Sequence, residues 1–228
     1  MEMDAVAPLN HSTSPISQAE YDDYLSALLS GRSSACGDTV MRLLRNRIDV
    51  KSLYTELFQP SLYRVGELWE AGQVSVATEH LATSITERLM SLAYPAIFSR
   101  EHTDHKAVVS CAANEYHQIG GRMVADVFEL NRWHGYFLGA NTPVQDLVRI
   151  IEEREPEVVA LSVSVYFNMP SLARAIDAVR RVHPTISILV GGQAFRWGDG
   201  NLTSTYPDVQ PMASLADLER FIGEREGG

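Results

Sequence analysis

Three short stretches of this chain carry residue types that could hold a metal ion and a large ligand. The first contains a histidine two positions after an acidic residue, and the others contain serines and paired glycines. The residues are Glu115, His117 and Gly120, then Ser162 and Ser164, then Gly191 and Gly192. A histidine beside a carboxylate is a poised metal ligand, because the carboxylate orients the ring and raises the basicity of its other nitrogen. Glycines allow a ligand to pass close to the backbone, since they have no side chain.

Each stretch follows an apolar run that is typical of a buried strand. The runs cover residues 107–111, 158–162 and 186–190, and segments with helical periodicity separate them. Ligands of open parallel sheets bind beyond the carboxyl ends of the strands. We therefore expect the three stretches to lie at one edge of one sheet.

The second half of the chain alternates strands with helices. Further strands are predicted over 135–138 and 209–212, and the predicted helices cover 119–131, 144–153, 171–182 and a last segment from 214. Nearly continuous apolar strands that alternate with helices are typical of a sheet buried on both faces. The prediction is a flavodoxin-like or Rossmann-like, doubly wound parallel sheet of five strands.

The first half has helical periodicity throughout, from about residue 16 to residue 100. Glycines 31 and 72 interrupt the pattern, and Pro60 predicts a kink in the third helix. Four amphipathic helices joined by short links predict a bundle. We expect a flexible polar tail over 1–17, a four-helix bundle over 18–102 and the sheet domain over 104–228.

Composition narrows the classes of function. The chain has 228 residues, a formal charge of −10 and two cysteines, which are too few for a disulfide framework or a cysteine-rich zinc site. The negative charge argues against a broad nucleic-acid surface. No apolar run approaches the roughly 20 residues that span a bilayer, and residues 1–17 show no secretory signal. We expect a cytoplasmic protein that contacts neither membrane nor nucleic acid directly and has no DNA-binding module.

The spacing of the motif residues resembles the cobalamin-binding module of methionine synthase and its relatives. Forty-one residues separate Gly120 from Ser162, and twenty-six separate Ser164 from Gly191. The resemblance implies that His117 is the lower axial ligand of cobalt. It also implies that Glu115 orients His117 and that Ser162 extends this hydrogen-bonded chain.

The same resemblance gives the glycines a role and exposes two departures. Gly120, Gly191 and Gly192 would leave room for the nucleotide tail of the corrinoid. The family commonly has Asp where this chain has Glu115, which makes the contact with His117 less assured, and an apolar residue where this chain has Ser164. A solvated histidine and a glycine turn are the alternative interpretation of either feature alone, but the joint match favours cobalamin.

The helical half adds a second resemblance. Trp69 precedes the pair Glu79 and His80 by ten and eleven residues, as in the cap of CarH-type cobalamin photoreceptors. The resemblance implies that these three side chains face the upper, adenosyl side of the cofactor. A buried tryptophan with a solvated Glu-His pair is the structural alternative. Glu70 stands where that family often has a second cobalt-binding histidine, so capture of cobalt by that route is not available here.

Several functions follow from these resemblances. The first is a light sensor, not an enzyme, that binds adenosylcobalamin and changes its conformation or self-association, with an unknown downstream protein partner. The second is a corrinoid carrier of a methyltransferase system. A mutase subunit is a weaker third, because this chain lacks the substrate barrel. The resemblance extends to stand-alone photocobilins, which imply biliverdin as a second chromophore that aromatic side chains such as Tyr166, Phe167 and Trp197 could stack upon.

Overall fold

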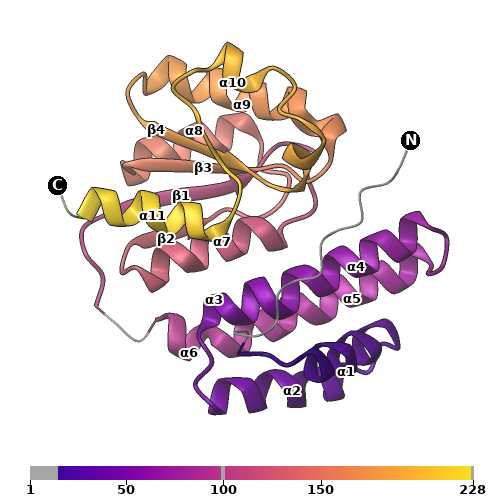
Figure 1. The fold of residues 1–228 in the computed structure, drawn as a ribbon. Coiled ribbons are helices and arrows are strands. Elements are labelled where there is room, and N and C mark those ends of the chain that lie inside the picture. The colour runs from indigo at the N-terminus through magenta and orange to yellow at the C-terminus, as the bar shows by residue number, and fades with distance from the viewer. Residues whose placement is uncertain (1–14, 99–100, 227–228) are drawn as a thin grey trace. The chain divides into compact units, whose positions relative to one another are not determined.

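A computed structural model describes residues 15–98 and 101–226 of the chain. The chain divides into two units, Met1–Ala96 and Ile97–Gly228 (Figure 1). The first fourteen positions of the predicted tail lie outside the described residues. Its end belongs to the helical unit, because Ile16 is buried and Ser17 caps the first helix in a capping box with Glu20.

The first unit is helical, as predicted. Its main helices pack through buried apolar side chains such as Tyr24, Leu53 and Ile85. The segments are α1 (Gln18–Leu29), α2 (Ser33–Arg45), α3 (Val50–Ser52), η1 (Leu53–Phe58), α4 (Gln59–Glu70), α5 (Val76–Met90), η2 (Ser91–Ala93) and α6 (Tyr94–Ile97). Because α3, η1 and α4 follow one another without a break, they form the third of the four predicted helices.

The third helix contains a π-helical segment directly before Pro60. In η1 the hydrogen bonds reach one residue further back than in an α-helix, and the N–H of Gln59 donates to the carbonyl of Tyr54. A proline has no N–H, and its ring crowds the carbonyl four residues earlier. The wider turn ahead of Pro60 accommodates both effects. The position that predicted a kink therefore coincides with a change of helix type, and the helix continues through it.

The second unit contains the predicted five-stranded parallel sheet. Its strands are β1 (Lys106–Cys111), β2 (His134–Phe137), β3 (Val158–Ser162), β4 (Ser187–Gly191) and β5 (Gln210–Met212). The strand order is β2-β1-β3-β4-β5, and every neighbouring pair is parallel. This is the flavodoxin-like order, in which the direction of winding reverses between β1 and β3. Ligands bind at such a switch point.

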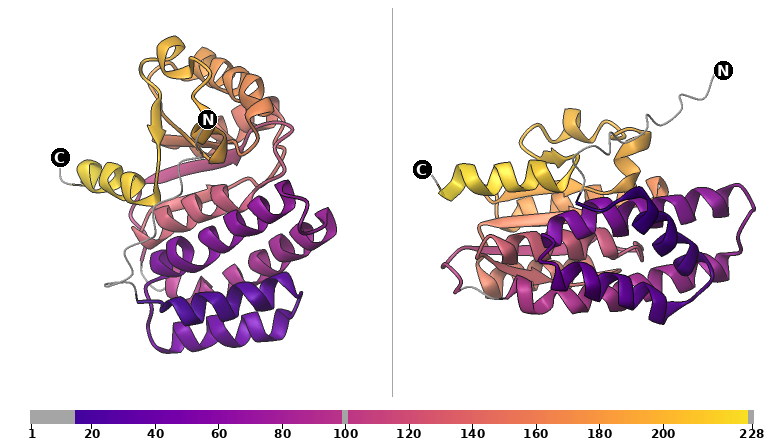
Figure 2. Two further views of the ribbon diagram at one scale, coloured as in Figure 1. Left: turned by 45° about the vertical axis from the view of Figure 1, so that its right-hand side comes forward. Right: turned by 60° about the horizontal axis from the view of Figure 1, so that its bottom comes forward.

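Helices cover both faces of the sheet (Figures 1 and 2). Successive strand residues point to opposite faces, so Val108 and Val159 pack into one core while Ala107 and Val158 pack into the other. The longer helices are α7 (Ile119–Leu130), α8 (Val144–Arg154), α9 (Met169–Val182) and α11 (Leu215–Glu226), and the short ones are η3 (Tyr166–Asn168), η4 (Gln193–Trp197) and α10 (Leu202–Thr205). Side chains of α8 and α9 fill the first core, and those of α7 and α11 fill the second.

Among the described residues, no helix combines the length and the apolar character that crossing a membrane requires.

Candidate functional site

The three predicted stretches meet because β1, β3 and β4 end level with one another. In the parallel register Cys111 lies opposite Ser162, and Ser162 lies opposite Gly191. The loops that follow these strands therefore leave the sheet side by side. The expectation that they share one edge of the sheet is confirmed.

Glu115 and His117 lie in the loop between β1 and α7. The Glu115 side chain is buried, and its Oε1 accepts a hydrogen bond from the backbone N–H of His117 at 2.9 Å. The same oxygen lies 2.6 Å from Nδ1 of the His117 ring. The His117 side chain is 57% exposed. With Nδ1 engaged by the carboxylate, Nε2 is the ring nitrogen that would ligate a metal. The extra methylene of glutamate does not prevent the contact.

The second oxygen of Glu115 is bound by the loop after β3. Oε2 accepts hydrogen bonds from the backbone N–H groups of Ser164 at 2.9 Å and Val165 at 3.0 Å. It also accepts one from the side-chain amide of Asn168 at 3.1 Å. One carboxylate therefore joins the two loops that flank the switch point. Ser164 contributes its backbone to this arrangement.

The carboxylate of Glu115 is ionised at neutral pH. Burial alone would raise its pKa, but hydrogen bonds from His117, Val165 and Asn168 outweigh burial and lower the pKa to about 2. A charged acceptor next to Nδ1 favours the tautomer in which that nitrogen carries the proton. In the neutral ring this arrangement leaves Nε2 as the nitrogen without a proton, and a metal binds to that form.

Ser162 and Gly120 lie next to each other at this edge. Ser162 is the last residue of β3 and is buried. A Cβ atom on Gly120 would lie 3.9 Å from its hydroxyl oxygen, which is an ordinary contact. The described hydrogen bonds to the Glu115 carboxylate come from His117, Ser164, Val165 and Asn168. The role of Ser162 in the hydrogen-bonded chain stays a prediction.

The fold leaves no room for a side chain at Gly192 and little room at Gly191. Gly192 has a φ of 115°, and a Cβ there would lie 2.2 Å from the carbonyl oxygen of Val163. A Cβ on Gly191 would lie 3.0 Å from the carbonyl oxygen of Met212. The sequence suggested that these glycines make room for a ligand. The structure shows that neighbouring strands already need the space, and a role in ligand binding stays a prediction.

The helical unit presents Trp69, Glu79 and His80 near the turn between α4 and α5. Trp69 is 47% exposed in the last turn of α4, so the alternative of a buried tryptophan is wrong. Oε1 of Glu79 accepts a hydrogen bond from Thr83 at 3.0 Å. Nε2 of His80 lies 3.5 Å from Oε2 of Glu79. All three residues lie at one end of the helix pair, and their role in cofactor binding stays a prediction.

Asn168 is the residue that the sequence analysis missed. It stands at the N-cap position of α9, where asparagine commonly accepts a hydrogen bond from the helix backbone, but its side chain makes no such bond. Its amide instead donates to Glu115 and, at 3.2 Å, to the carbonyl of Asn114. The sequence signal, an asparagine just before a proline-containing helix start, indicates only a cap.

The residues at this edge of the sheet suit a metal that is already coordinated by a macrocycle. Within 15–98 and 101–226, no group of three or more His, Cys, Asp or Glu side chains could hold a metal ion. His117 offers a single nitrogen. A corrin ring supplies four equatorial nitrogens to cobalt and needs only one axial ligand from the protein, so these residues fit a corrinoid and not a bare ion.

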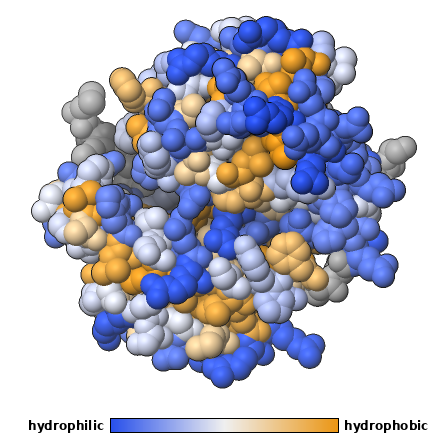
Figure 3. All heavy atoms as spheres, turned by 180° about the vertical axis from the view of Figure 1, so that it is seen from behind, coloured by the Kyte–Doolittle hydropathy of each residue, from blue (hydrophilic) through white to orange (hydrophobic). Residues whose placement is uncertain are grey.

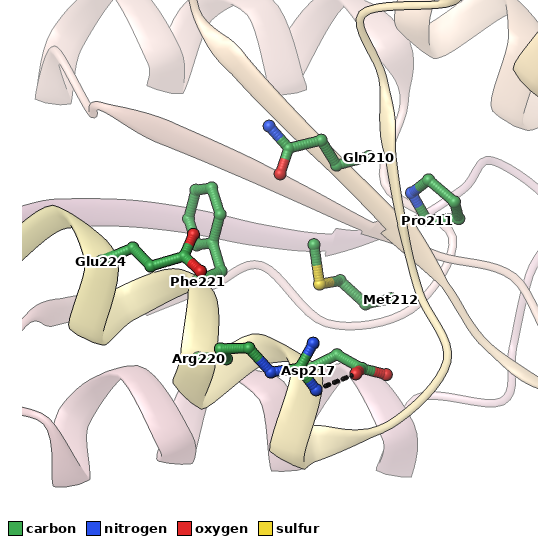
Figure 4. Close-up of a pocket in the computed structure, with 7 residues that line it drawn as sticks. All are labelled: Gln210, Pro211, Met212, Asp217, Arg220, Phe221 and Glu224. Atoms are coloured by element: carbon green, nitrogen blue, oxygen red, sulfur yellow. Dashed lines mark hydrogen bonds and ion pairs between the residues drawn. The ribbon is translucent and has the colours of Figure 1, made fainter.

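A shallow pocket elsewhere in the unit is unrelated to this arrangement. It lies between the edge strand β5 and α11, where Arg220 pairs with Asp217 at 2.7 Å (Figure 4). Strands β3 and β4 separate β5 from β1 in the sheet. The pocket therefore does not include the loop that carries His117.

Comparison with protein families identifies the two parts of the chain. A family described as the B12 binding domain matches residues 105–206, and a second family of the same description matches residues 20–94. The chain carries a two-part cobalamin-binding module. The second match covers most of the helical unit, including Trp69, Glu79 and His80, and the first covers all predicted residues of the sheet edge. The prediction of a cobalamin-binding protein is confirmed at this level.

Two curated relatives are similar to the module at low identity. The HTH-type transcriptional repressor CarH of Myxococcus xanthus is 29% identical over 147 residues, which are 63% of this chain and 48% of that protein. The HTH-type transcriptional repressor CarA of the same organism is 26% identical over 186 residues, which are 80% of this chain and 62% of that protein. The chain therefore spans about half to three-fifths of the length of these relatives.

Solved structures show the same fold. The monomethylamine corrinoid protein of Methanosarcina barkeri superposes with a TM-score of 0.79 at 14% identity, covering 91% of this chain and 98% of that chain. The methanol:cobalamin methyltransferase complex MtaBC of the same organism matches with a TM-score of 0.51 at 14% identity, covering 92% of this chain and 81% of that chain. The predicted fold, a helical region followed by a Rossmann-like sheet, is confirmed.

Proposed function

We propose that this cobalamin-binding module is a light-responsive sensor that binds adenosylcobalamin. In this proposal His117 is the lower axial ligand of cobalt, and Trp69, Glu79 and His80 act on the upper ligand. Bound adenosylcobalamin would supply a cobalt–carbon bond that light breaks. The protein works as a binding and signalling component and not as an enzyme.

The observation that carries the proposal is the buried Glu115 carboxylate that orients His117 at the switch point of the sheet. A carboxylate that fixes one histidine ring is what a protein would need if it supplied a single ligand to the metal of a macrocycle. The helical unit supports the choice of sensor, because its Trp69 and Glu79-His80 pattern resembles the cap of CarH-type photoreceptors. Similarity to CarH and CarA supports the same choice.

Each residue has a physical task in this proposal. Glu115 holds the proton on Nδ1 of His117 and fixes the ring, so that Nε2 faces the metal. Trp69 offers an exposed indole that can pack against the upper ligand and exclude water. Glu79 and His80 offer hydrogen-bond groups for the hydroxyls of a ribose. With Glu70 in place of a histidine, the state after illumination cannot use a second histidine at that position.

The decisive experiment is an absorption spectrum of the adenosylcobalamin complex before and after green light, with the elution volume measured on the same samples. A light-induced change in both the spectrum and the elution volume supports the sensor. A complex that keeps one elution volume in dark and light, and that prefers methylcobalamin, contradicts it.

The alternative function is a corrinoid carrier in a methyltransferase system. The fold shared with the monomethylamine corrinoid protein favours this alternative, because a carrier needs the two-part module and the lower ligand but no light-sensitive upper ligand. Transfer of a methyl group from the methylcobalamin complex to an acceptor in the presence of a methyltransferase would support it.

A bilin is an extension of the sensor proposal. Tyr116, Tyr166, Phe167 and Trp197 are exposed aromatic side chains of the sheet unit, and such rings can stack on a tetrapyrrole. Trp133 is fully buried in the core and is not available for stacking. Addition of biliverdin should produce a red absorption band if this chromophore binds, and no such band if cobalamin acts alone. A homo-oligomer that responds to light and a downstream protein partner belong to the same proposal.

A further inference from the structure

We propose that Asn168 is a positioning residue for His117 and that it acts through Glu115. This inference rests on the proposed role of His117 as the cobalt ligand, and it adds a residue to which no family motif points. Asn168 lies fifty-three positions from Glu115 in the sequence, yet its amide and the carboxylate are 3.1 Å apart.

Asn168 stands at an N-cap position, but its side chain does not cap the helix. As the N-cap of α9 it would ordinarily accept a hydrogen bond from the helix, but its amide donates instead to the carboxylate of Glu115 and the carbonyl of Asn114. Both acceptors belong to the loop between β1 and α7. The residue is 9% exposed, so these two hydrogen bonds are made in a site from which water is largely excluded, where they are strong.

Glu115 also accepts hydrogen bonds from the backbone that leads into η3 and α9. The N–H groups of Ser164 and Val165 lie just before η3, which leads directly into α9. The Glu115 carboxylate accepts from both. A negative charge is favourable at the N-terminal end of a helix. The carboxylate is therefore attracted towards this loop as well as towards His117.

Asn168 is one of the donors that hold the two oxygens of the Glu115 carboxylate in place, one towards His117 and the other towards the loop after β3. Oε1 faces the N–H and Nδ1 of His117, and Oε2 faces the two backbone N–H groups and the Asn168 amide. A carboxylate offers about four lone-pair positions, so these donors leave it little freedom to rotate. Without the Asn168 amide, one oxygen loses its side-chain donor. The carboxylate can then rotate more freely, and its 2.6 Å contact with Nδ1 of His117 is held less firmly.

The test compares Asn168→Ala and Asn168→Asp with the control Asn131→Ala. Asn168→Ala removes the donor, and Asn168→Asp keeps the volume of the side chain but replaces the donor with a charged oxygen that repels the Glu115 carboxylate. Asn131 is a matched control, because its amide donates to the carbonyl of Val127 at 2.8 Å beyond the far end of α7. Loss of the Asn131 amide should change stability but leave the hydrogen bonds of Glu115 intact.

The first measurement is made without cobalamin. Long-range ¹H–¹⁵N correlation spectra at pH 8 report which nitrogen of the His117 ring carries the proton. We expect the Nδ1–H tautomer in the parent protein and in Asn131→Ala, and a mixture of tautomers in both Asn168 variants. Tautomer populations in the Asn168 variants that equal those of the parent would overturn the inference.

The second measurement is a titration with hydroxocobalamin that is followed by absorption. Loss of the direct outer partner of a metal ligand weakens metal affinity by roughly 10–100-fold. Because Asn168 acts one step further out, through Glu115, we expect the Kd of both Asn168 variants to increase by about the lower end of that range, with a shift towards the base-off spectrum. Parent-like Kd and spectrum in these variants would contradict the inference. If the parent binds no cobalamin while the tautomer still responds to Asn168, the proposed function fails and the positioning of His117 by Asn168 stands.

Discussion

The candidate residues of the two units differ in burial and in the number of hydrogen bonds that hold them. In the sheet unit, Glu115 is fully buried and each of its carboxylate oxygens has hydrogen-bond donors. In the helical unit, Trp69 is about half exposed, and His80 has a side chain that is 75% exposed. On the face shown in Figure 3, hydrophobic residues form separate groups among hydrophilic ones.

Under the proposed function, this difference separates a preorganised lower-ligand residue from residues that would act on the upper ligand. A lower ligand must hold one geometry whatever stands above the cobalt, and burial with dense hydrogen bonding provides that rigidity. Residues that act on an upper ligand need to respond when that ligand changes. Exposed side chains with few partners retain the freedom to do so. Substitutions in both units test this division.

The largest effect should come from His117→Ala. It removes the nitrogen that would ligate cobalt, so we expect the affinity for cobalamin to fall by more than the roughly 10–100-fold typical of an outer partner. The absorption spectrum of any remaining complex should be of the base-off type. His183→Ala, at the far end of α9, serves as a control that keeps the parent spectrum. A parent-like spectrum in His117→Ala would refute the assignment of the ligand.

The second prediction concerns the backbone that supports the same sheet edge. Gly192→Ala would place a Cβ 2.2 Å from the Val163 carbonyl at a φ of 115°. Residues other than glycine in such a conformation cost about 1–3 kcal/mol, and the clash adds to this cost. Gly198→Ala is the matched control, with a φ of 111° and no atom within 4 Å of the added Cβ. Urea unfolding should show a larger loss for Gly192→Ala, and equal losses would show that the close approach is unimportant.

The third prediction addresses the helical unit. Trp69→Ala should leave the free energy of unfolding within about 0.5 kcal/mol of the parent, as is usual at exposed positions. The preference for adenosylcobalamin over methylcobalamin should nevertheless fall, and the response to green light should weaken. Leu92→Ala removes another exposed apolar side chain, beyond the far end of α5. This control should change neither the ligand preference nor the response to light. An unchanged ligand preference and light response in Trp69→Ala would favour the carrier function.

The smallest effect is a pH dependence of the helical unit. Hydrogen bonds from Arg42 and Ser17 lower the pKa of Glu20 from 4.5 to about 2. A lowered pKa in the folded state stabilises the protein above pH 4.5, and this contribution is lost as the pH falls from 4.5 towards 2. Because the side chain is partly exposed, the contribution should be about 1 kcal/mol or less. Glu20→Gln should therefore be less stable than the parent at pH 6 and nearly equal to it at pH 2. A stability difference that does not change with pH would contradict this origin.

Much of the fold was predictable from local patterns. The apolar run from Val158 to Ser162 predicted β3 with the bounds that the structure shows, because a strand buried on both faces leaves an uninterrupted apolar signal. Ile16 and the π-helical segment η1 were not predictable in this way. The burial of Ile16 depends on packing against other helices, and η1 depends on how the backbone adapts to Pro60.

The residues that could hold a corrinoid are recognisable without a structure, because a histidine near an acidic residue and glycines at set distances form a pattern along the chain. The sequence also indicates that the strands before them are buried. The three-dimensional fold was needed to show that Glu115 binds both His117 and the loop after β3, and that Asn168 is one of its partners. These partners lie about fifty positions apart in the chain. The parallel pairing that sets Cys111 opposite Ser162 brings their loops together.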